Sequence, residues 1–423
     1  MNDSQEQSFD IVIVGGGMVG ATMACLLRDL DLKIALVDRA KFDVLNLEVT
    51  GGKFDPRVSA ITTATKKIFL DLKVWPDIEA ARCCNYLGMQ VWDADCTGCI
   101  NFSAIDLNQS ELGTIVENSI LSSALYHQIS NQKNLSLLAP MNIASMEVSE
   151  GGTRLITDKG QQKTAKLIIA ADGANSKIRE LCRFSTREWE YNHNAIVTTV
   201  KTELAHEQTA LQRFIDTGPL AFLPLAVEQN DSIQNYCSIV WTAIPKHAEY
   251  LMQLSDKNFC TELTKAIEGR LGNIEWCDKR FTFPLWQRHS IDYVKNNVVL
   301  IGDAAHSIHP LAGQGVNLGF LDAAVLAREL HHGIEVGREL SDQTVLGRYQ
   351  RKRKGHNLGM MWLMEGFKHL FAEQALPIRW LRNIGMSGVD NNSVVKTNLA
   401  RRAMGLDWQT NDDFQRAEYL RSR

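Results

Sequence analysis

The strongest constraint on the fold is a glycine-rich turn near the start of the chain. Residues 9–14 form a largely apolar run of the length of a buried parallel strand, and a helical pattern runs from the turn to residue 30. Between them, Gly15 permits a tight turn, Gly17 lets the backbone approach a pyrophosphate, and Gly20 allows the helix to pack closely on the strand. Glycine clusters after strands also make ordinary turns, so a second feature is needed to indicate a dinucleotide site.

An acidic residue supplies that feature. A second apolar run over residues 33–37 ends at Asp38, 18 residues after Gly20. A carboxylate at this place accepts hydrogen bonds from ribose hydroxyls. An acid there favours an unphosphorylated ribose, as in FAD or NAD, and the motif does not choose between the two.

Two more buried-strand patterns end in chemically distinctive turns. Residues 164–171 lead into Asp172 and Gly173, and residues 298–301 lead into Gly302 and Asp303. A glycine-rich run follows the second turn, with Pro310, Gly313, Gln314, Gly315, Asn317, Gly319 and Asp322. Asp303 stands at a strand end, where a carboxylate can accept hydrogen bonds from the ribityl hydroxyls of a flavin. The glycines free the backbone to approach a flat ring, and their amides can stabilise negative charge on it.

With these three motifs in place, the sequence resembles the FAD-dependent aromatic monooxygenases of the para-hydroxybenzoate hydroxylase type. The run over residues 309–322 is similar, more narrowly, to the ubiquinone-biosynthesis hydroxylases. The runs at residues 55–61, 116–118 and 222–225 support the resemblance, which extends from about residue 9 to residue 406.

The resemblance implies which residues act. It places Asn317 and the backbone near Pro310, with Gly313, Gln314 and Gly315, against the flavin ring and the substrate. It assigns Arg57 and Asn118 to the ribityl-phosphate chain, and Asp172 with Gly173 to the pyrophosphate and to reductant binding. It further implies FAD as cofactor, molecular oxygen as co-substrate and, as reductant, NAD(P)H or another electron donor. The implied reaction is hydroxylation of a polyprenylated phenol or quinol through a flavin C4a-hydroperoxide.

Two other functions stay open at this stage. One is a flavin monooxygenase or epoxidase that acts on another aromatic or lipid substrate, and the other is a noncatalytic flavin-bearing subunit of a biosynthetic complex. A metal site is disfavoured, because Asp303, His306 and His309 lack further ligands at matching spacing. The pattern CxxC at Cys96 and Cys99 has no second pair and is interpreted as ordinary thiols.

Length and local patterns predict an interleaved α/β architecture. A chain of 423 residues favours two or three compact units. We expect a Rossmann-like FAD-binding domain from residues 1–75, 105–182 and 285–345, and a mainly antiparallel β-sheet substrate domain from residues 76–104 and 183–284. A C-terminal helical region is expected over residues 346–423. Phe222, Leu223, Trp241, Phe283 and Trp286 are candidates for an apolar substrate pocket.

Charge and cysteine usage bear on partners and location. A net charge of −4 disfavours nucleic acid as a partner, and nine scattered cysteines favour a reducing compartment. The polar N-terminus has no secretory pattern, and no apolar stretch is long enough to span a bilayer, so a cytoplasmic protein is expected. Residues 348–402 hold 11 basic and 3 acidic residues, including the basic run at 351–354. This charge, together with neighbouring apolar residues, suggests docking at the inner face of the cytoplasmic membrane or on other ubiquinone-biosynthesis proteins.

Overall fold

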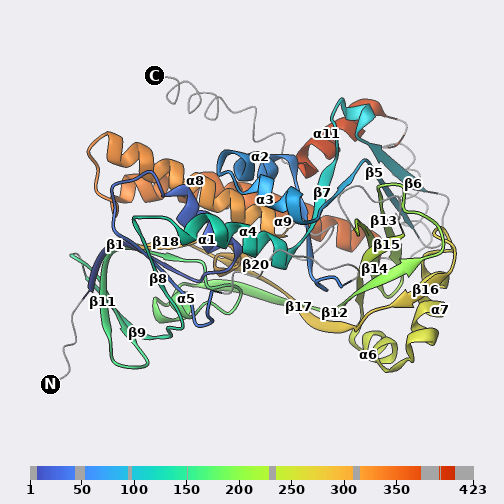
Figure 1. Cartoon of the computed structure of the whole chain (residues 1–423), viewed down its shortest axis with the longest axis horizontal. Coiled ribbons are helices and arrows are strands. Elements are labelled where there is room, and N and C mark those ends of the chain that lie inside the picture. The colour runs from blue at the N-terminus through green and yellow to red at the C-terminus, as the bar shows by residue number, and fades with distance from the viewer. Residues whose placement is uncertain are drawn as a thin grey trace.

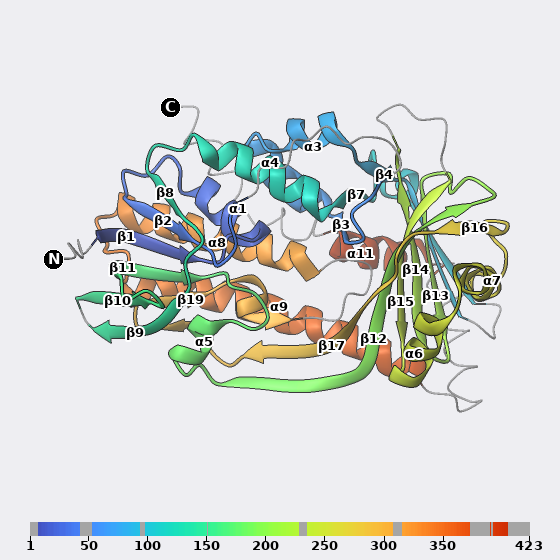
Figure 2. The ribbon, with the colours of Figure 1, turned by 60° about the horizontal axis from the view of Figure 1, so that its bottom comes forward.

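The fold is described from a computed structural model, which covers residues 7–42, 53–93, 98–149, 151–227, 235–307, 315–372, 390 and 392–404. Two large sheets lie at opposite ends of the molecule, and the long strands β12 and β17 run between them (Figure 2). Helices α8 and α9 lie side by side along the first sheet (Figure 1).

The first sheet has eight strands in the order β18-β19-β11-β1-β2-β8, with β10 paired to β11 and β9 paired to β10. Its five central strands, from β19 to β8, are parallel. Ile11, Val12 and Ile13 are completely buried, as expected for a strand covered on both faces. The strands are β1 (Gln7–Val14), β2 (Ile34–Val37), β8 (Leu135–Leu138), β9 (Ile143–Ser149), β10 (Gly152–Thr157), β11 (Gln162–Ala170), β18 (Val294–Lys295) and β19 (Val298–Leu300).

The second sheet has nine strands in the order β20-β17-β12-β15-β14-β13-β5-β6, with β16 paired to β12. All its pairings are antiparallel except that of β13 with β5. The strands are β5 (Gly88–Asp93), β6 (Cys99–Ser103), β12 (Thr186–Thr202), β13 (Thr209–Ile215), β14 (Gly218–Leu225), β15 (Tyr236–Ala243), β16 (Ile274–Cys277), β17 (Phe281–Ser290) and β20 (His306–Ser307).

A small third sheet, of order β3-β7-β4, lies between the two. It consists of β3 (Val58–Ile61), β4 (Cys84–Tyr86) and β7 (Gly113–Glu117). The helices are α1 (Met18–Leu26), α2 (Thr63–Asp71), α3 (Trp75–Ala81), α4 (Asn118–Ser130), α5 (Lys177–Leu181), α6 (Pro245–Gln253), α7 (Asp256–Ala266), α8 (Gly315–Glu335), α9 (Gln343–Ala372) and α11 (Ser393–Ala403), with short 3-10 helices η1 (Ile105–Leu107) and η2 (Gly302–Ala304).

This arrangement confirms the predicted fold class, a parallel Rossmann-like sheet joined to a mainly antiparallel sheet, with helices following at the C-terminal side. The segments around β5 and β6 share the second sheet with β12–β16, although more than 80 residues separate β6 from β12. Strand β17 crosses residue 285 without a break. The domain boundaries themselves stay a prediction.

The aromatic pocket expected from the second sheet does not form from the residues that were proposed. Phe222 and Trp241 are at most 2% exposed and pack in a core with Phe259 of α7. Leu223 is buried in a separate cluster. Phe283 and Trp286 are 41% and 47% exposed on β17. The alternation of a strand cannot tell which face a helix will cover, and here α6 and α7 cover the face that holds Phe222.

One member of the basic run at residues 351–354 is buried, so the run does not present all four charges to solvent, and docking through this region stays a prediction. Arg353 is fully buried, and its Nε lies 2.6 Å from Asp322. Lys352 forms an ion pair with Glu329 at 2.9 Å, while Arg351 is exposed. Successive helix positions point in different directions, so a run of charges in sequence is not a patch in space. Among the helices that the structure describes, none combines the length and the apolar composition that a bilayer-spanning segment needs.

Candidate active site

Four strand ends meet at one edge of the parallel sheet and carry the motifs found in the sequence. The amide of Gly15, after β1, donates to Val37 O of β2 at 2.8 Å. On the other side of β1, the amide of Ala171 donates to Val14 O at 2.7 Å, and the amide of Ile301 donates to Ala170 O at 3.0 Å. The turns that bear Asp38, Gly15, Asp172 and Gly302 are therefore neighbours, at the edge where open α/β sheets bind ligands.

The glycine turn after β1 has the close contacts that its pattern predicts. Gly15 has a φ of +105°, and a Cβ there would lie 2.3 Å from Ala171 O. A Cβ on Gly20 would lie 1.9 Å from Gly15 O, which explains the close approach of helix to turn. At Gly17, by contrast, a Cβ would meet no atom within 4 Å, so the turn is open toward the outside. Gly17 is also the N-cap of α1 and has no side-chain cap, which leaves the first amides of the helix available to a phosphate.

Asp38 is placed directly against this turn. Its Oδ2 accepts the amide of Gly16 at 2.6 Å, and its Oδ1 accepts the amide of Ala40 at 2.8 Å. A carboxylate has about four acceptor positions, so it can hold the turn and still accept a ribose hydroxyl. Its ribose role stays a prediction that this position supports.

The turn after β19 interlocks with α1 and α8. Gly302 has a φ of +58°, and a Cβ there would lie 3.2 Å from a methyl group of Val19. A Cβ on Gly319 would lie 2.7 Å from Cγ2 of Val19 and 3.2 Å from the Cα of Gly302. The absence of a side chain at Gly319 is therefore required by packing inside the protein, whereas the sequence suggested closeness to a flat ring.

Asp303 follows Gly302 in this turn. The side chain is exposed, yet the protein around it desolvates the carboxyl group and raises its pKa, an effect that His306 opposes and Asp322 reinforces. A partly desolvated carboxylate at a ligand-binding edge gains from hydroxyl donors. This environment suits the contact with ribityl hydroxyls that the sequence predicts.

The turn after β11 holds Asp172 and Gly173. Asp172 Oδ2 accepts the amide of Ile178 at 3.1 Å, and burial raises the pKa of its carboxyl group, against a lowering hydrogen bond from Ser176. Gly173 has a φ of +80° and open space at its Cβ position. Buried Arg179 of α5 donates to Ala174 O at 2.6 Å and to Ala304 O at 2.9 Å. It fastens this turn to the Gly302 turn, a role that the sequence analysis missed because the two carbonyl groups lie 130 residues apart.

Arg57 and Asn118 come together beside the third sheet. The amide of Asn118 donates to Arg57 O at 3.0 Å, and Asn118 Oδ1 accepts the hydroxyl of Ser59 at 2.6 Å. The Arg57 side chain is exposed. Next to them, Arg82 and Glu117 form a buried ion pair at 2.6 Å, which no pattern in the sequence indicates. The predicted contacts of Arg57 and Asn118 with a flavin chain stay untested.

Two of the residues assigned to the ring and substrate, Gly315 and Asn317, lie at the start of α8. Gly315 is the first residue of this helix. Asn317 is buried, its Nδ2 donates to Ala60 O at 2.7 Å, and its Oδ1 accepts the amide of Thr62 at 3.1 Å. The amide group of Asn317 thus fastens α8 to β3, and this positions the helix N-terminus. Pro310, Gly313 and Gln314 lie outside the described residues, so the catalytic roles of this group stay predictions.

The site as a whole fits FAD. The open edge at Gly17 and Gly173, the uncapped N-terminus of α1 and the carboxylates of Asp38 and Asp303 supply what a pyrophosphate, a ribose and a ribityl chain require. No cluster of three or more potential metal ligands occurs in the part of the chain that the structure describes. His306 instead lies 2.5 Å from Asp322 in a buried pair.

Comparison with known proteins identifies the class. A model of the FAD binding domain family matches residues 8–361, and the chain belongs to this family. The solved structure of p-nitrophenol 4-monooxygenase from Pseudomonas putida covers 95% of this chain and 98% of its own, with a TM-score of 0.73 at 17% identity, which shows the same fold.

Closer relatives narrow the class. The chain is 32% identical over 400 residues to 3-demethoxyubiquinol 3-hydroxylase of Escherichia coli, covering 95% of this chain and 99% of that protein. It is 30% identical over 402 residues to the ubiquinone hydroxylase UbiL of Rhodospirillum rubrum, covering 95% and 91%. The protein is therefore an FAD-dependent hydroxylase of the ubiquinone-biosynthesis family, and the predicted family, enzyme class and cofactor are confirmed.

Proposed function

We propose that this protein hydroxylates the aromatic ring of a polyprenylated phenol or quinol intermediate of ubiquinone biosynthesis. The observation that carries the proposal is the likeness to 3-demethoxyubiquinol 3-hydroxylase over 99% of that protein's length. The turns after β1, β11 and β19 lie at one edge of the parallel sheet and the start of α8 packs on the last of them, an arrangement that supports the proposal.

In this proposal the chain's own residues bind FAD and orient the substrate ring. The first amides of α1 bind the pyrophosphate, and Asp38 and Asp303 accept hydrogen bonds from sugar and ribityl hydroxyls. Asn317 holds the start of α8 against β3, so that the helix N-terminus stabilises negative charge at the ring. Bound FAD supplies the activation of molecular oxygen. The protein around it excludes water and keeps the substrate ring in position for attack.

We propose NAD(P)H as the reductant. The sequence has one dinucleotide fingerprint, at Gly15, Gly17 and Gly20, and the site above assigns it to FAD. A nicotinamide would therefore bind transiently, with the turn at Asp172 and Gly173 as the candidate contact. Anaerobic mixing of the holoenzyme with NADH or NADPH, followed by flavin absorbance, tests this assignment. Bleaching of the flavin supports it, and an unchanged spectrum in the presence of substrate contradicts it.

Oxygen consumption by the purified holoenzyme tests the reaction. A prenylated phenol, such as a short-chain prenylphenol, is added with reductant, and oxygen uptake is compared with the mass of the product. The proposal predicts uptake that depends on the prenylphenol and a product 16 mass units heavier, the mass of one oxygen atom. Oxygen uptake without that product indicates another substrate, and no dependence on any aromatic substrate favours the noncatalytic alternative.

A further inference from the structure

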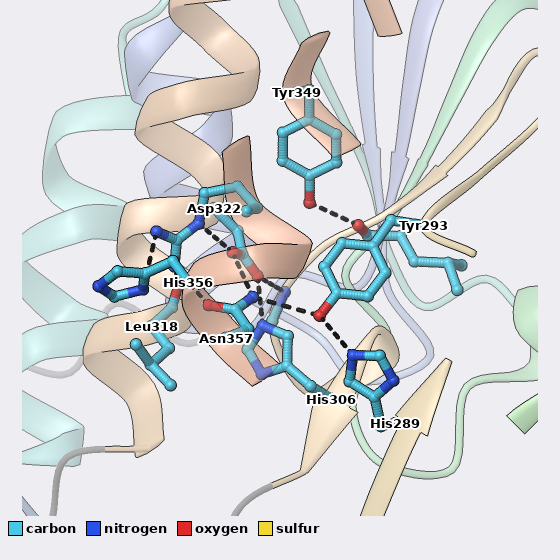
Figure 3. Close-up of polar contacts among 11 residues, drawn as sticks. His289, Tyr293, His306, Leu318, Asp322, Tyr349, His356 and Asn357 are labelled. Atoms are coloured by element: carbon cyan, nitrogen blue, oxygen red, sulfur yellow. Dashed lines mark hydrogen bonds and ion pairs between the residues drawn. The ribbon is translucent and has the colours of Figure 1, made fainter. Parts of the chain in front are cut away.

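The carboxylate of Asp322, on α8, is enclosed by four donors that come from three other parts of the chain (Figure 3). Oδ2 accepts the amide of Gly302 at 3.0 Å and Nε2 of His306 at 2.5 Å. Oδ1 accepts Nε of Arg353 at 2.6 Å and Nδ2 of Asn357 at 3.1 Å. Asp322 is fully buried, so these four bonds replace its entire hydration. Two of these bonds, from Gly302 and His306, hold the turn before Asp303 and strand β20 after it.

Arg353 supplies a positive charge that offsets the cost of burying the Asp322 carboxylate. The Arg353 side chain is also completely buried. Burial of Asp322 alone would raise the pKa of its carboxyl group, but His306 and Arg353 hold that pKa well below its usual range. Nη2 of Arg353 donates to Leu318 O at 3.2 Å and to Asn357 Oδ1 at 2.7 Å, and Nη1 lies 3.3 Å from Nδ1 of His356. A planar guanidinium group satisfies these partners at once, whereas a lysine could not.

The same helix also contacts β19, the strand that leads into the Gly302 turn. Tyr349, one turn before Arg353 on α9, donates its hydroxyl to Leu300 O at 2.7 Å. Asn357, one turn after Arg353, donates to the hydroxyl oxygen of Tyr293 at 3.3 Å, and that hydroxyl lies 3.2 Å from Nε2 of His289 (Figure 3). Three successive turns of α9 thus contact, in order, β19 through Leu300, α8 through Asp322, and Tyr293 just before β18.

We propose that Arg353 is a positioning residue for the cofactor site. By fixing Asp322, it fixes Gly302 and His306, and through them the orientation of Asp303 toward the ribityl chain of FAD. The C-terminal helix α9 then controls the affinity for flavin although none of these side chains needs to touch it. This inference rests on the use of FAD, which belongs to the family, and is independent of the quinol substrate proposed above.

The test compares the variants Arg353→Met and Arg353→Lys with the control Arg351→Met, an exposed position two residues earlier on α9. Each holoenzyme is diluted in series, free FAD is separated by ultrafiltration and quantified, and the visible circular dichroism of the remaining bound flavin is recorded. Losing a charge-assisted contact of this kind should weaken FAD binding by roughly 30-fold in Arg353→Met. We expect a smaller loss in Arg353→Lys, an altered dichroism band in both, and no change in the control.

The alternative is that Arg353 only stabilises the fold. In that case both variants unfold at lower temperature, but the FAD dissociation constant and the dichroism of the bound flavin match the wild type, and the proposal is wrong. If Arg353→Met does not yield folded protein, Arg353→Lys and Asn357→Leu decide the question, since each removes part of the contact set around Asp322 and retains a buried partner for it.

Discussion

Val19 of α1 and Gly319 of α8 are packed so closely that a methyl group on Gly319 would lie 2.7 Å from Cγ2 of the valine. Val19 also lies against Gly302. The start of α1, the turn after β19 and the start of α8 therefore pack against one another around one valine side chain. Gly302 and Gly319 of the third motif thus serve its packing against the first.

This packing predicts the effect of Gly319→Ala. The added methyl group forces Val19 or α8 to move, and overpacking of this kind costs about 1–3 kcal/mol. Urea unfolding should show that loss of free energy, together with weaker FAD binding. The matched control is Gly355→Ala on α9, where nothing lies within 4 Å of the Cβ position and alanine favours the helix by about 0.5–1 kcal/mol. Equal effects at the two positions would contradict the packing argument.

Asp303→Ala should separate binding of flavin from stability. Charge-assisted hydrogen bonds to the ribityl chain are lost, so the protein should fold and purify largely without flavin.

The same substitution should change the pH dependence of stability. The raised pKa of Asp303 means that the folded, FAD-free protein resists ionisation of this group. That protein loses stability as pH rises from the ordinary Asp pKa through the raised one, and the variant should lack this loss. Full FAD occupancy in the variant would rule out the assigned role, and Asp31→Ala, at an exposed carboxylate, serves as the control.

The histidines around the Asp322 cluster predict a loss of stability in acid. Burial lowers the pKa of His289 and of His356 to about 4, with nearby positive groups adding to the effect. Their folded-state pKa lies below the unfolded value near 6.5, so their neutral forms stabilise the fold fully above pH 6.5. That stability falls by up to about 1.4 kcal/mol per pH unit for each histidine as pH drops from there toward 4.

Urea unfolding at pH 7.5 and pH 5 measures this effect. His289→Gln should lose less free energy between the two pH values than the wild type, because one of the groups that gains a proton on unfolding has been removed. His127→Gln, at an exposed histidine, is the control. Identical pH dependence in the wild type and in His289→Gln would show that the His289 environment is not as described.

Membrane docking through the C-terminal region needs a revised test. Substituting all of residues 351–354 would destroy the Arg353–Asp322 pair and unfold the site, so Arg353 must be retained. Trp362 is 74% exposed and Arg351 is exposed on the same helix, which makes them the candidates for contact with an anionic bilayer. Arg351→Glu with Trp362→Ser should reduce co-sedimentation with vesicles that contain anionic lipid. Unchanged co-sedimentation of a folded double variant would count against docking by this helix.

Sequence reasoning reached the parts of the site that local patterns determine. Gly15, Asp38, Asp172 and Gly302 each follow directly from a buried strand, and parallel strands bring their ends to one edge, so the convergence of these residues could be predicted.

The contacts between distant segments could not be predicted in this way. Asn317 bonds to Ala60 across 257 positions, and Arg353 bonds to Asp322 from a different helix. A basic run looks the same in sequence whether or not one of its members is buried, and the pairing partner that decides this lies elsewhere in the chain. The choice between pocket and core for Phe222 and Trp241 was open for a similar reason, because α7 supplies part of the surface that buries them.

The central claim is that this protein hydroxylates a prenylated ring on the way to ubiquinone. Deleting the gene in its host and profiling prenylated quinone intermediates by mass spectrometry, with and without the restored gene, tests it most directly. The account predicts that one under-hydroxylated precursor accumulates and that the restored gene removes it, whereas a restored Asp303→Ala gene does not. An unchanged quinone pool, in a host freed of any overlapping hydroxylase, would contradict it.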